Sequence, residues 1–315
     1  MTIVANTFLT FSAIGNREDL TDTIYNISPI EVPFQSMIGK TKASATFHEW
    51  QTDSLAAAAA NAQLQGDDVS FAAVTATSRL GNRTQVLRKE VVIAGTQESV
   101  NKAGRKSEMV YQLQKKSKEL KRDLEFVLCS NQAPVTGNST TAPQMRPLCG
   151  WYATNDSRGV GGADGTTSTA ATDGTQRAIS ETILQDVMQN CWVQGGNPTV
   201  ALCGPKQKRA ISAFTGGATK FDKTEDKTLY AVVDVYVSDF GQIKIIPSRF
   251  TRGAASATDR EVHVLDTDYW SLATLRPTQT VDLAKTGDAE KAMILVECTL
   301  EARNEAASGI AADLT

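Results

Sequence analysis

The fold is decided by residues 96–131, which read TQESVNKAGRKSEMVYQLQKKSKELKRDLEFVLCSN. Apolar side chains recur there at helical spacing and form one stripe, while a dense set of charges covers the opposite face. The stripe consists of Met109, Leu113, Leu120, Leu124 and Val127. We predict a long helix that begins at Thr96 or Ser99 and is interrupted near Gly104. Its narrow stripe should pack on the chain's own core and leave a broad face in solvent.

The composition is that of a globular protein with room for about two domains. The chain has 315 residues, of which 41% are hydrophobic and 21% are charged, and its net charge of -3 does not fit a basic nucleic-acid binder. No apolar run approaches the roughly 18 residues of a membrane helix, so we expect no membrane contact. The absence of a basic residue before Arg17 does not fit a secretory signal.

The five cysteines are odd in number, widely spaced and set among apolar residues. They are Cys129, Cys149, Cys191, Cys203 and Cys298. This usage predicts reduced, buried thiols in a reducing compartment.

The first part of the chain reads as an arm followed by a hairpin. Residues 1–45 are extended, with a short helix expected at 18–25. Strands are expected at 46–52 and 85–93, around an alanine-rich polar tract at 55–78. Neither strand shows clean alternation, and an isolated two-stranded hairpin is marginally stable in water. We infer that this hairpin rests on another molecule; a mobile surface loop is the alternative.

The second part reads as a compact α/β unit and returning strands. Residues 132–147 and 154–175 have loop composition. Ser180 should cap a helix with Trp192 on its apolar side, and Pro205 should open another. Strands are expected at residues 198–203, 230–237, 242–247, 261–265 and 293–303. The last strand alternates apolar and polar residues, which predicts a half-buried strand.

Short motifs imitate catalytic signatures without their context. Residues 239–241 read DFG, but no glycine-rich or catalytic loop accompanies them, so we expect a hairpin turn. Ser99 and Lys102, with KTG at 285–287, match two of three penicillin-binding signatures. A Ser/Lys acyl-transfer hydrolase therefore remains as an alternative of a different class. The two histidines, His48 and His263, are far apart, and we expect no catalytic residue, cofactor or metal site.

Residues 102–122 are strongly basic. They hold eight Lys/Arg residues against the acidic Glu108 and Glu119. A solvated helix face is one interpretation. A surface that meets Asp67 and Asp68 of another copy's hairpin, or packaged nucleic acid, is the other.

Long strings across most of the chain resemble the major capsid proteins of tailed bacteriophages, which have the Hong Kong 97-like fold. The strings are EDLTDTIYNISPIEVPFQSMIGK (18–40), EWQTDSLAAAAANA (49–62), AGTQESVNKAGRKSEMVYQLQKKSKELKRDLEF (94–126), DFGQIKIIPSRF (239–250), LDTDYWSLATLRP (265–277) and DLAKTGDAEKAMILVECTLEARNEAASG (282–309). The resemblance implies an α+β fold with four parts. These are an N-terminal arm (1–45), an extended β-hairpin loop (46–95), a peripheral domain with a spine helix and sheet (96–147 and 262–315) and an α/β axial domain (148–261).

The resemblance also implies a structural shell subunit and not an enzyme. The chain would assemble with itself into pentamers and hexamers of an icosahedral head, in the host bacterial cytoplasm, and end in the virion. Implied partners are a separate scaffolding protein, a portal, a decoration protein and packaged double-stranded DNA held by non-specific contact. An encapsulin-like nanocompartment shell protein is the alternative within the same fold.

We expect assembly contacts from the arm, the hairpin and the charged face of the long helix. The candidate residues are Pro29, Pro33, Phe34, Phe47, Trp50, Asp67, Asp68, Arg83, Arg88, Lys115, Lys118 and Arg122.

Overall fold

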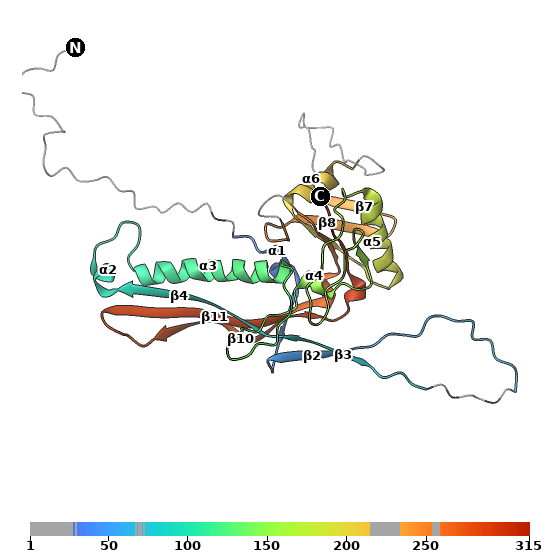
Figure 1. Cartoon of the computed structure of the whole chain (residues 1–315), viewed down its shortest axis with the longest axis horizontal. Coiled ribbons are helices and arrows are strands. Elements are labelled where there is room, and N and C mark those ends of the chain that lie inside the picture. Colours follow the sequence, from blue (N-terminus) through green and yellow to red (C-terminus); the bar gives the residue numbers. More distant parts are fainter. Residues whose placement is uncertain are drawn as a thin grey trace, which may run out of the picture.

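The structure is a computed structural model that describes residues 28, 30–66, 68, 71, 73–214, 234–253 and 259–315. These residues form a four-stranded sheet under a long helix, a six-stranded sheet, and a two-stranded ribbon that leaves the body (Figure 1). The helix expected at 18–25 lies outside the described residues, as do Pro29 and Asp67.

The long helix is α3, Glu108–Cys129, and it begins later than predicted. The side chain of Ser107 caps it by accepting a hydrogen bond from the backbone amide of Val110. A separate short helix, α2 (Gly95–Ser99), precedes it. The predicted break is confirmed, because Gly104 adopts a φ of +75° in the loop between the two helices. The predicted start at Thr96 or Ser99 is wrong for the long helix.

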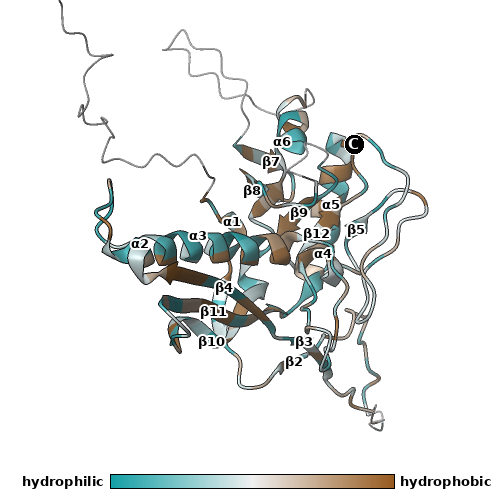
Figure 2. Ribbon diagram, turned by 60° about the vertical axis from the view of Figure 1, so that its left-hand side comes forward, coloured by the Kyte–Doolittle hydropathy of each residue, from teal (hydrophilic) through white to brown (hydrophobic). Residues whose placement is uncertain are grey.

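The buried stripe of α3 is confirmed in its C-terminal half. Its buried residues are Glu108, Leu120, Leu124, Glu125, Leu128 and Cys129. Met109, Leu113 and Val127 are only half-buried. In Figure 2 the helix is largely teal, whereas β4 and β11 beneath it carry long brown stretches. One narrow line of α3 therefore faces the core, as the pattern predicts.

The sheet under α3 has the strand order β1-β10-β11-β4. Its strands are β1 (Gly39–Lys42), β10 (Trp270–Leu283), β11 (Ala289–Ala302) and β4 (Gln85–Ala94). β1 is parallel to β10, and the other two pairs are antiparallel. The strand predicted at 293–303 is thus confirmed, as the second half of a longer strand.

The half-burial predicted for that strand is wrong. Nearly every residue of β11 from Ile294 onward is buried, including Thr299 and Glu301 on the face turned away from α3. Thr41 of β1 and Thr84 close this second face by donating hydrogen bonds to Glu301 and Glu297. These partners are more than 200 residues away in the chain, so alternation alone does not show them.

The ribbon pairs β2 (Phe47–Thr52) with β3 (Ser78–Arg83), in register from Phe47↔Arg83 to Thr52↔Ser78. The strand predicted at 85–93 exists as β4, but the predicted pairing with 46–52 is wrong because β4 pairs with β11. The two faces of β2 and β4 also alternate in exposure, contrary to our expectation. The sequence does not show this alternation, because a charged side chain occupies one of the half-buried positions of β4. Lys89 stands there and lies 2.5 Å from Asp123 of α3.

The second sheet has the order β5-β12-β9-β6-β8-β7. Its strands are β5 (Asp156–Ser157), β12 (Gly309–Ala311), β9 (Val262–Leu265), β6 (Val200–Cys203), β8 (Gly241–Pro247) and β7 (Val235–Ser238). The strands predicted at 198–203, 242–247 and 261–265 are confirmed. Residues 239–240 form the predicted hairpin turn, because Ser238 pairs with Gly241. The strand expected at 230–237 begins outside the described residues.

Two longer helices accompany the six-stranded sheet. α5 (Glu181–Val193) begins at Ser180, whose side chain accepts from the amide of Ile183, as predicted. α6 (Pro205–Ser212) begins at the predicted proline. Shorter elements are α4 (Leu148–Trp151), η3 (Thr267–Tyr269) and η4 (Glu305–Ala307). Residues 132–147 are largely irregular, as predicted, although Met145 is fully buried.

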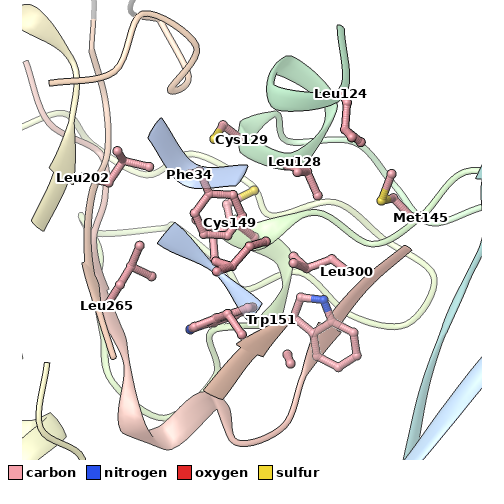
Figure 3. Close-up of a cluster of buried hydrophobic side chains, with 14 of the residues drawn as sticks. Phe34, Leu124, Leu128, Cys129, Met145, Cys149, Trp151, Leu202, Leu265 and Leu300 are labelled. Atoms are coloured by element: carbon pink, nitrogen blue, oxygen red, sulfur yellow. The ribbon is translucent and has the colours of Figure 1, made fainter. Parts of the chain in front are cut away.

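One hydrophobic cluster joins both sheets (Figure 3). It contains Leu128 of α3 and Leu300 of β11, together with Leu202 of β6 and Leu265 of β9. Phe34 lies among these side chains and is 0% exposed. The two sheets therefore share a core and do not form independent bodies.

Phe34 belongs to α1 (Pro33–Met37), which is fixed to α3 by Glu125. The backbone amides of Phe34 and Gln35 donate to the two carboxylate oxygens of Glu125, at 2.7 and 3.0 Å. A carboxylate at a helix N-terminus satisfies amides that have no partner within the helix. Burial raises the pKa of Glu125, and the two amide hydrogen bonds oppose this shift. Because Phe34 is inside its own chain, the structure removes it from the candidate assembly residues.

Replacing Phe34 with alanine should lower the free energy of unfolding by about 3–5 kcal/mol, because the change leaves a cavity where both sheets meet. Denaturant unfolding followed by tryptophan fluorescence measures this change. The matched control is Phe71→Ala, since Phe71 is 93% exposed and its loss should change stability by less than about 0.5 kcal/mol. Equal effects of the two substitutions would contradict the assignment of Phe34 to the core.

Candidate assembly surfaces

The tract between β2 and β3 exposes its apolar side chains. In the part that the structure describes, residues 53–77 contain no helix or strand. Leu55 is 99% exposed, Phe71 93% and Val74 98%, and Leu64 is also exposed. Figure 1 shows this tract extending away from the body at the end of the ribbon. Large apolar side chains gathered on one exposed segment are typical of an interaction site.

The base of the ribbon is held by its own chain through Trp50. The Trp50 ring lies 5.4 Å from the Trp151 ring and 5.8 Å from His48, measured between centroids. The guanidinium of Arg146 lies 4.4 Å from the Trp151 centroid, on the same aromatic cluster. Trp50 thus faces inward and orients the ribbon, while the tract beyond it remains uncovered.

Glu301 of β11 ties the ribbon to the sheet. Its carboxylate accepts hydrogen bonds from Thr41 Oγ1 at 2.7 Å and Arg303 Nε at 3.0 Å, and lies 3.4 Å from His48 Nε2. Burial alone raises the pKa of this group, but the hydrogen bonds from Thr41 and Arg303 outweigh it and hold the pKa below its usual value. The charged form of Glu301 therefore stabilises the junction.

Phe47 and Arg83 form a pair at the start of the ribbon, in which Phe47 is exposed and Arg83 is half-buried. The Arg83 guanidinium lies 4.9 Å from the Phe47 ring centroid, and Phe47 is 38% exposed. Gly81 allows this arrangement, because a Cβ there would lie 2.7 Å from the Phe47 ring. The pair presents an aromatic edge and a cation together, a combination enriched at protein interfaces.

Arg88 does not belong to the ribbon, contrary to our assignment. It lies on β4 in the four-stranded sheet, where its Nε is 2.9 Å from Glu90. Both side chains are exposed, so this ion pair contributes little stability.

Two of the candidate residues on the charged face of α3 are exposed lysines. Lys116 pairs with Glu119 at 2.8 Å, whereas Lys115 and Lys118 are exposed and have no ion pair within the described residues. Arg122 differs, because it is half-buried and its guanidinium lies 6.0 Å from the Phe250 ring. Asp68 is exposed on the tract beyond the ribbon. Lys115, Lys118 and Asp68 therefore lie at the surface, and Arg122 lines a cavity.

A further apolar surface, which the sequence did not identify, lies on the six-stranded unit. Trp192 is 58% exposed, although its place in the α5 pattern predicts burial. Its ring lies 5.9 Å from that of Phe240, and Val193 beside it is also exposed. Val235 and Val237 of β7 are also exposed, but they lie on the face of the strand opposite to Tyr236, which contacts α5. The only sequence signal for this surface is that Trp192 stands in the last turn of α5, where a helix can leave the core.

The residues that imitate a hydrolase do not form a catalytic pair. Ser99 Oγ donates to the carbonyl of Gly95 at 2.9 Å, and Lys102 Nζ donates to the carbonyl of Glu98 at 2.7 Å. A nucleophile and its base need a hydrogen bond to each other. Neither side chain makes that bond in this structure.

All five cysteines are buried and free, as predicted. Burial raises the pKa of Cys191, Cys203 and Cys298 to about 12, which keeps these thiols protonated and unreactive.

The described residues contain neither a candidate metal site nor a candidate membrane span. No group of three or more His, Cys, Asp or Glu side chains there is placed to hold a metal ion. No helix among these residues is both long enough and apolar enough to cross a bilayer.

A long helix over a four-stranded sheet, a second α/β unit and a protruding ribbon are the parts of a tailed-phage capsid subunit with the Hong Kong 97-like α+β fold. The fold is similar to the capsid of a native GTA particle, with a TM-score of 0.64 at 10% identity, covering 97% of this chain and 98% of that chain. It is also similar to the mature capsid of bacteriophage PhiM1, with a TM-score of 0.57 at 9% identity, covering 99% and 97%.

The sequence comparison identifies the family. Residues 3–315 match the family model of the SU10 major capsid protein, and the chain belongs to this family. It is 29% identical, over an alignment of 342 residues, to the major capsid protein of Escherichia phage Phieco32, with 96% of each chain covered. The resemblance predicted from the sequence is confirmed, and the protein is a component of the virion.

Acidification should weaken the junction at Glu301. Because the pKa of Glu301 is lowered by folding, its contribution is present above the ordinary value of 4.5 and is lost as the pH falls through the lower folded value. Glu301→Gln should therefore destabilise the chain by about 1–3 kcal/mol at pH 7, and this difference should shrink below pH 4.5.

Thermal melts of both proteins between pH 7 and pH 3.5 measure the effect. Glu90→Gln, which breaks only the exposed pair with Arg88, should change the melting temperature little at any pH. A stability difference for Glu301→Gln that stays constant with pH would contradict the role of its charge.

Proposed function

We propose that this chain assembles with copies of itself into pentamers and hexamers of an icosahedral head that encloses the phage genome. In this proposal it acts as a structural subunit and not as an enzyme. The observation that carries the proposal is the tract at residues 53–77, which exposes Leu55, Phe71 and Val74 in the single chain. Such a segment needs a neighbouring molecule to remove these side chains from water.

The pairing of the strands refines the expected division into parts. We limit the arm to the residues before α1, because α1 and β1 belong to the body, and we limit the extended loop to β2, β3 and the tract between them. The peripheral domain then contains α3 and the four-stranded sheet, including β4, because β4 pairs with β11. The axial domain contains the six-stranded sheet, including β9 and β12, because both belong to that sheet.

In this arrangement the extended loop of one copy lies across the peripheral domain of its neighbour. Phe47 and Arg83 would contact the neighbour near the base of the ribbon, and Asp68 would lie near Lys115 or Lys118. The surface at Trp192 and Phe240 would join axial domains. Each contact is modest, but closed symmetry repeats it, so that the assembled state becomes stable.

The remaining partners follow from the same proposal. A scaffolding protein and a portal would direct assembly in the host bacterial cytoplasm, and a decoration protein would bind the finished shell. Packaged double-stranded DNA would meet the inner surface by non-specific contact. The family match favours a phage head over an encapsulin-like nanocompartment, and genomic DNA inside purified particles would distinguish the two.

Removing the exposed apolar side chains should abolish assembly without unfolding the chain. The variant replaces Leu55, Leu64, Phe71 and Val74 with serine. It should keep the melting temperature of the wild type, since these side chains make no core contacts, yet form no shells. Electron microscopy and analytical ultracentrifugation measure shells and free subunits.

The matched control changes four polar positions of the same tract, with Gln63, Gln65, Thr75 and Thr77 replaced by serine. It should assemble like the wild type. Closed shells formed in equal yield by the apolar-to-serine variant would overturn the interlocking role of the tract.

Reversing the charges of Lys115 and Lys118 to glutamate should raise the protein concentration needed for assembly several-fold at low salt. The reason is that the exposed cations would no longer meet an acidic neighbour. Light scattering at 50 and 500 mM salt measures assembly, and the defect should narrow at high salt. Lys106→Glu, an exposed change outside α3, is the control. An assembly curve identical to that of the control would contradict the predicted contact.

A further inference from the structure

A cavity of about 930 Å³ opens where the C-terminal end of α3 meets the start of α6 and the loop after β8. Figure 1 shows the C-terminal end of α3 beside α1. The cavity walls include Arg122, Phe126, Arg249, Phe250 and Thr251. Glu31, two residues before the start of α1, also lines it. This volume is in the range that accepts a small molecule or a few side chains, roughly 300–1,000 Å³.

Polar groups in these walls lack partners in the described part of the chain. Arg122 Nε and Thr251 Oγ1 are buried without a hydrogen bond, and Thr251 is only 3% exposed. Arg249 is exposed and makes no ion pair there. Arg252, by contrast, already pairs with Asp173 and Glu261. Because a buried donor without an acceptor costs free energy, the cavity favours an anionic group between Arg122 and Arg249.

The same cavity offers aromatic surface. Phe126 is 59% exposed although it stands in the last turns of α3, and Phe250 is half-buried beside Arg122. An occupant that pairs with the arginines and also covers the aromatic rings therefore carries carboxylates together with apolar side chains.

The arm contains such a segment a few residues before the cavity. Residues 18–25 read EDLTDTIY. At the spacing of the helix expected there, Glu18 and Asp22 lie on one face, and Leu20 and Ile24 lie on another. Tyr25 precedes Glu31 by six residues, and an extended chain of that length spans up to about 20 Å. The segment is therefore tethered within reach.

We propose that this cavity is the docking site of the chain's own arm segment at residues 18–25. Glu18 and Asp22 meet Arg122 and Arg249, and Leu20 and Ile24 cover Phe126 and Phe250. The short tether favours the chain's own segment over that of a second copy, because it supplies an effective concentration of about millimolar. The inference concerns a single chain and does not depend on assembly.

Hydrogen exchange of the soluble full-length chain tests the docking. Amides of residues 18–25 should exchange at least tenfold more slowly than those of the exposed tract at 55–66. The variant Phe126→Ser with Arg249→Glu should abolish this protection and leave the chain folded, and its melting temperature should fall only by the few degrees that the lost docking contributes. The control, Val110→Ser with Lys118→Glu, makes the same kinds of change on the exposed face of α3 and should keep the protection. Equal exchange of residues 18–25 in the wild type and the cavity variant overturns the proposal.

Disulfide trapping identifies the occupant. Leu20→Cys with Phe126→Cys should form a bond within one chain, seen as a shifted monomer on a non-reducing gel. The five native thiols are buried and should not interfere. Disulfide dimers alone, formed on mixing the two single variants, would assign the cavity to a second copy and overturn the proposal. The proposal is also overturned if no disulfide forms and the thiol of Phe126→Cys does not react with maleimide. In that case another ligand covers the cavity.

Discussion

The burial of one line of α3 against β11 is the contact on which both halves of the molecule depend. Leu120, Leu124 and Leu128 lie in the same cluster as Leu300, and this cluster continues to Leu202 and Leu265 of the six-stranded sheet. Each buried leucine contributes about 1.5–3 kcal/mol. Phe34 completes the cluster because Glu125 fixes the amides of α1. Since one helix line serves both sheets, the body is a single rigid support.

The ribbon, unlike the body, has few contacts with the rest of its own chain. Its base is fixed by Trp50 against Trp151 and by Glu301, but beyond Thr52 the chain leaves every core contact. The apolar side chains of the tract remain in water until another molecule covers them. The stability of the subunit is therefore separate from its contacts with neighbours. A shell protein needs this separation, because it must fold first and join its lattice afterwards.

Local patterns in the sequence predicted local structure well. The stripe of α3, the cap at Ser180 and the turn after Ser238 each depend on residues a few positions apart. Pairing between distant segments was not predictable in this way. β3 has the sequence SRLGNR, which is mostly polar and contains a glycine, so its composition does not predict a strand. We therefore assigned β4 as the partner of β2. Phe34 was placed at the surface because its anchor, Glu125, is 91 residues away. The family resemblance supplied the overall fold, but it also placed β4 in the extended loop.

β3 and β4 are separated only by Thr84, which is buried and hydrogen-bonded to Glu297. The ribbon and the body sheet therefore share one nearly continuous length of backbone. A pull on the tip of the ribbon is transmitted into the β4–β11 ladder along the strand axis, in shear. In that direction all the hydrogen bonds of the ladder resist together, whereas a ribbon attached by a loose loop would yield first at its hinge. The body can thus bear mechanical tension applied through its longest projection.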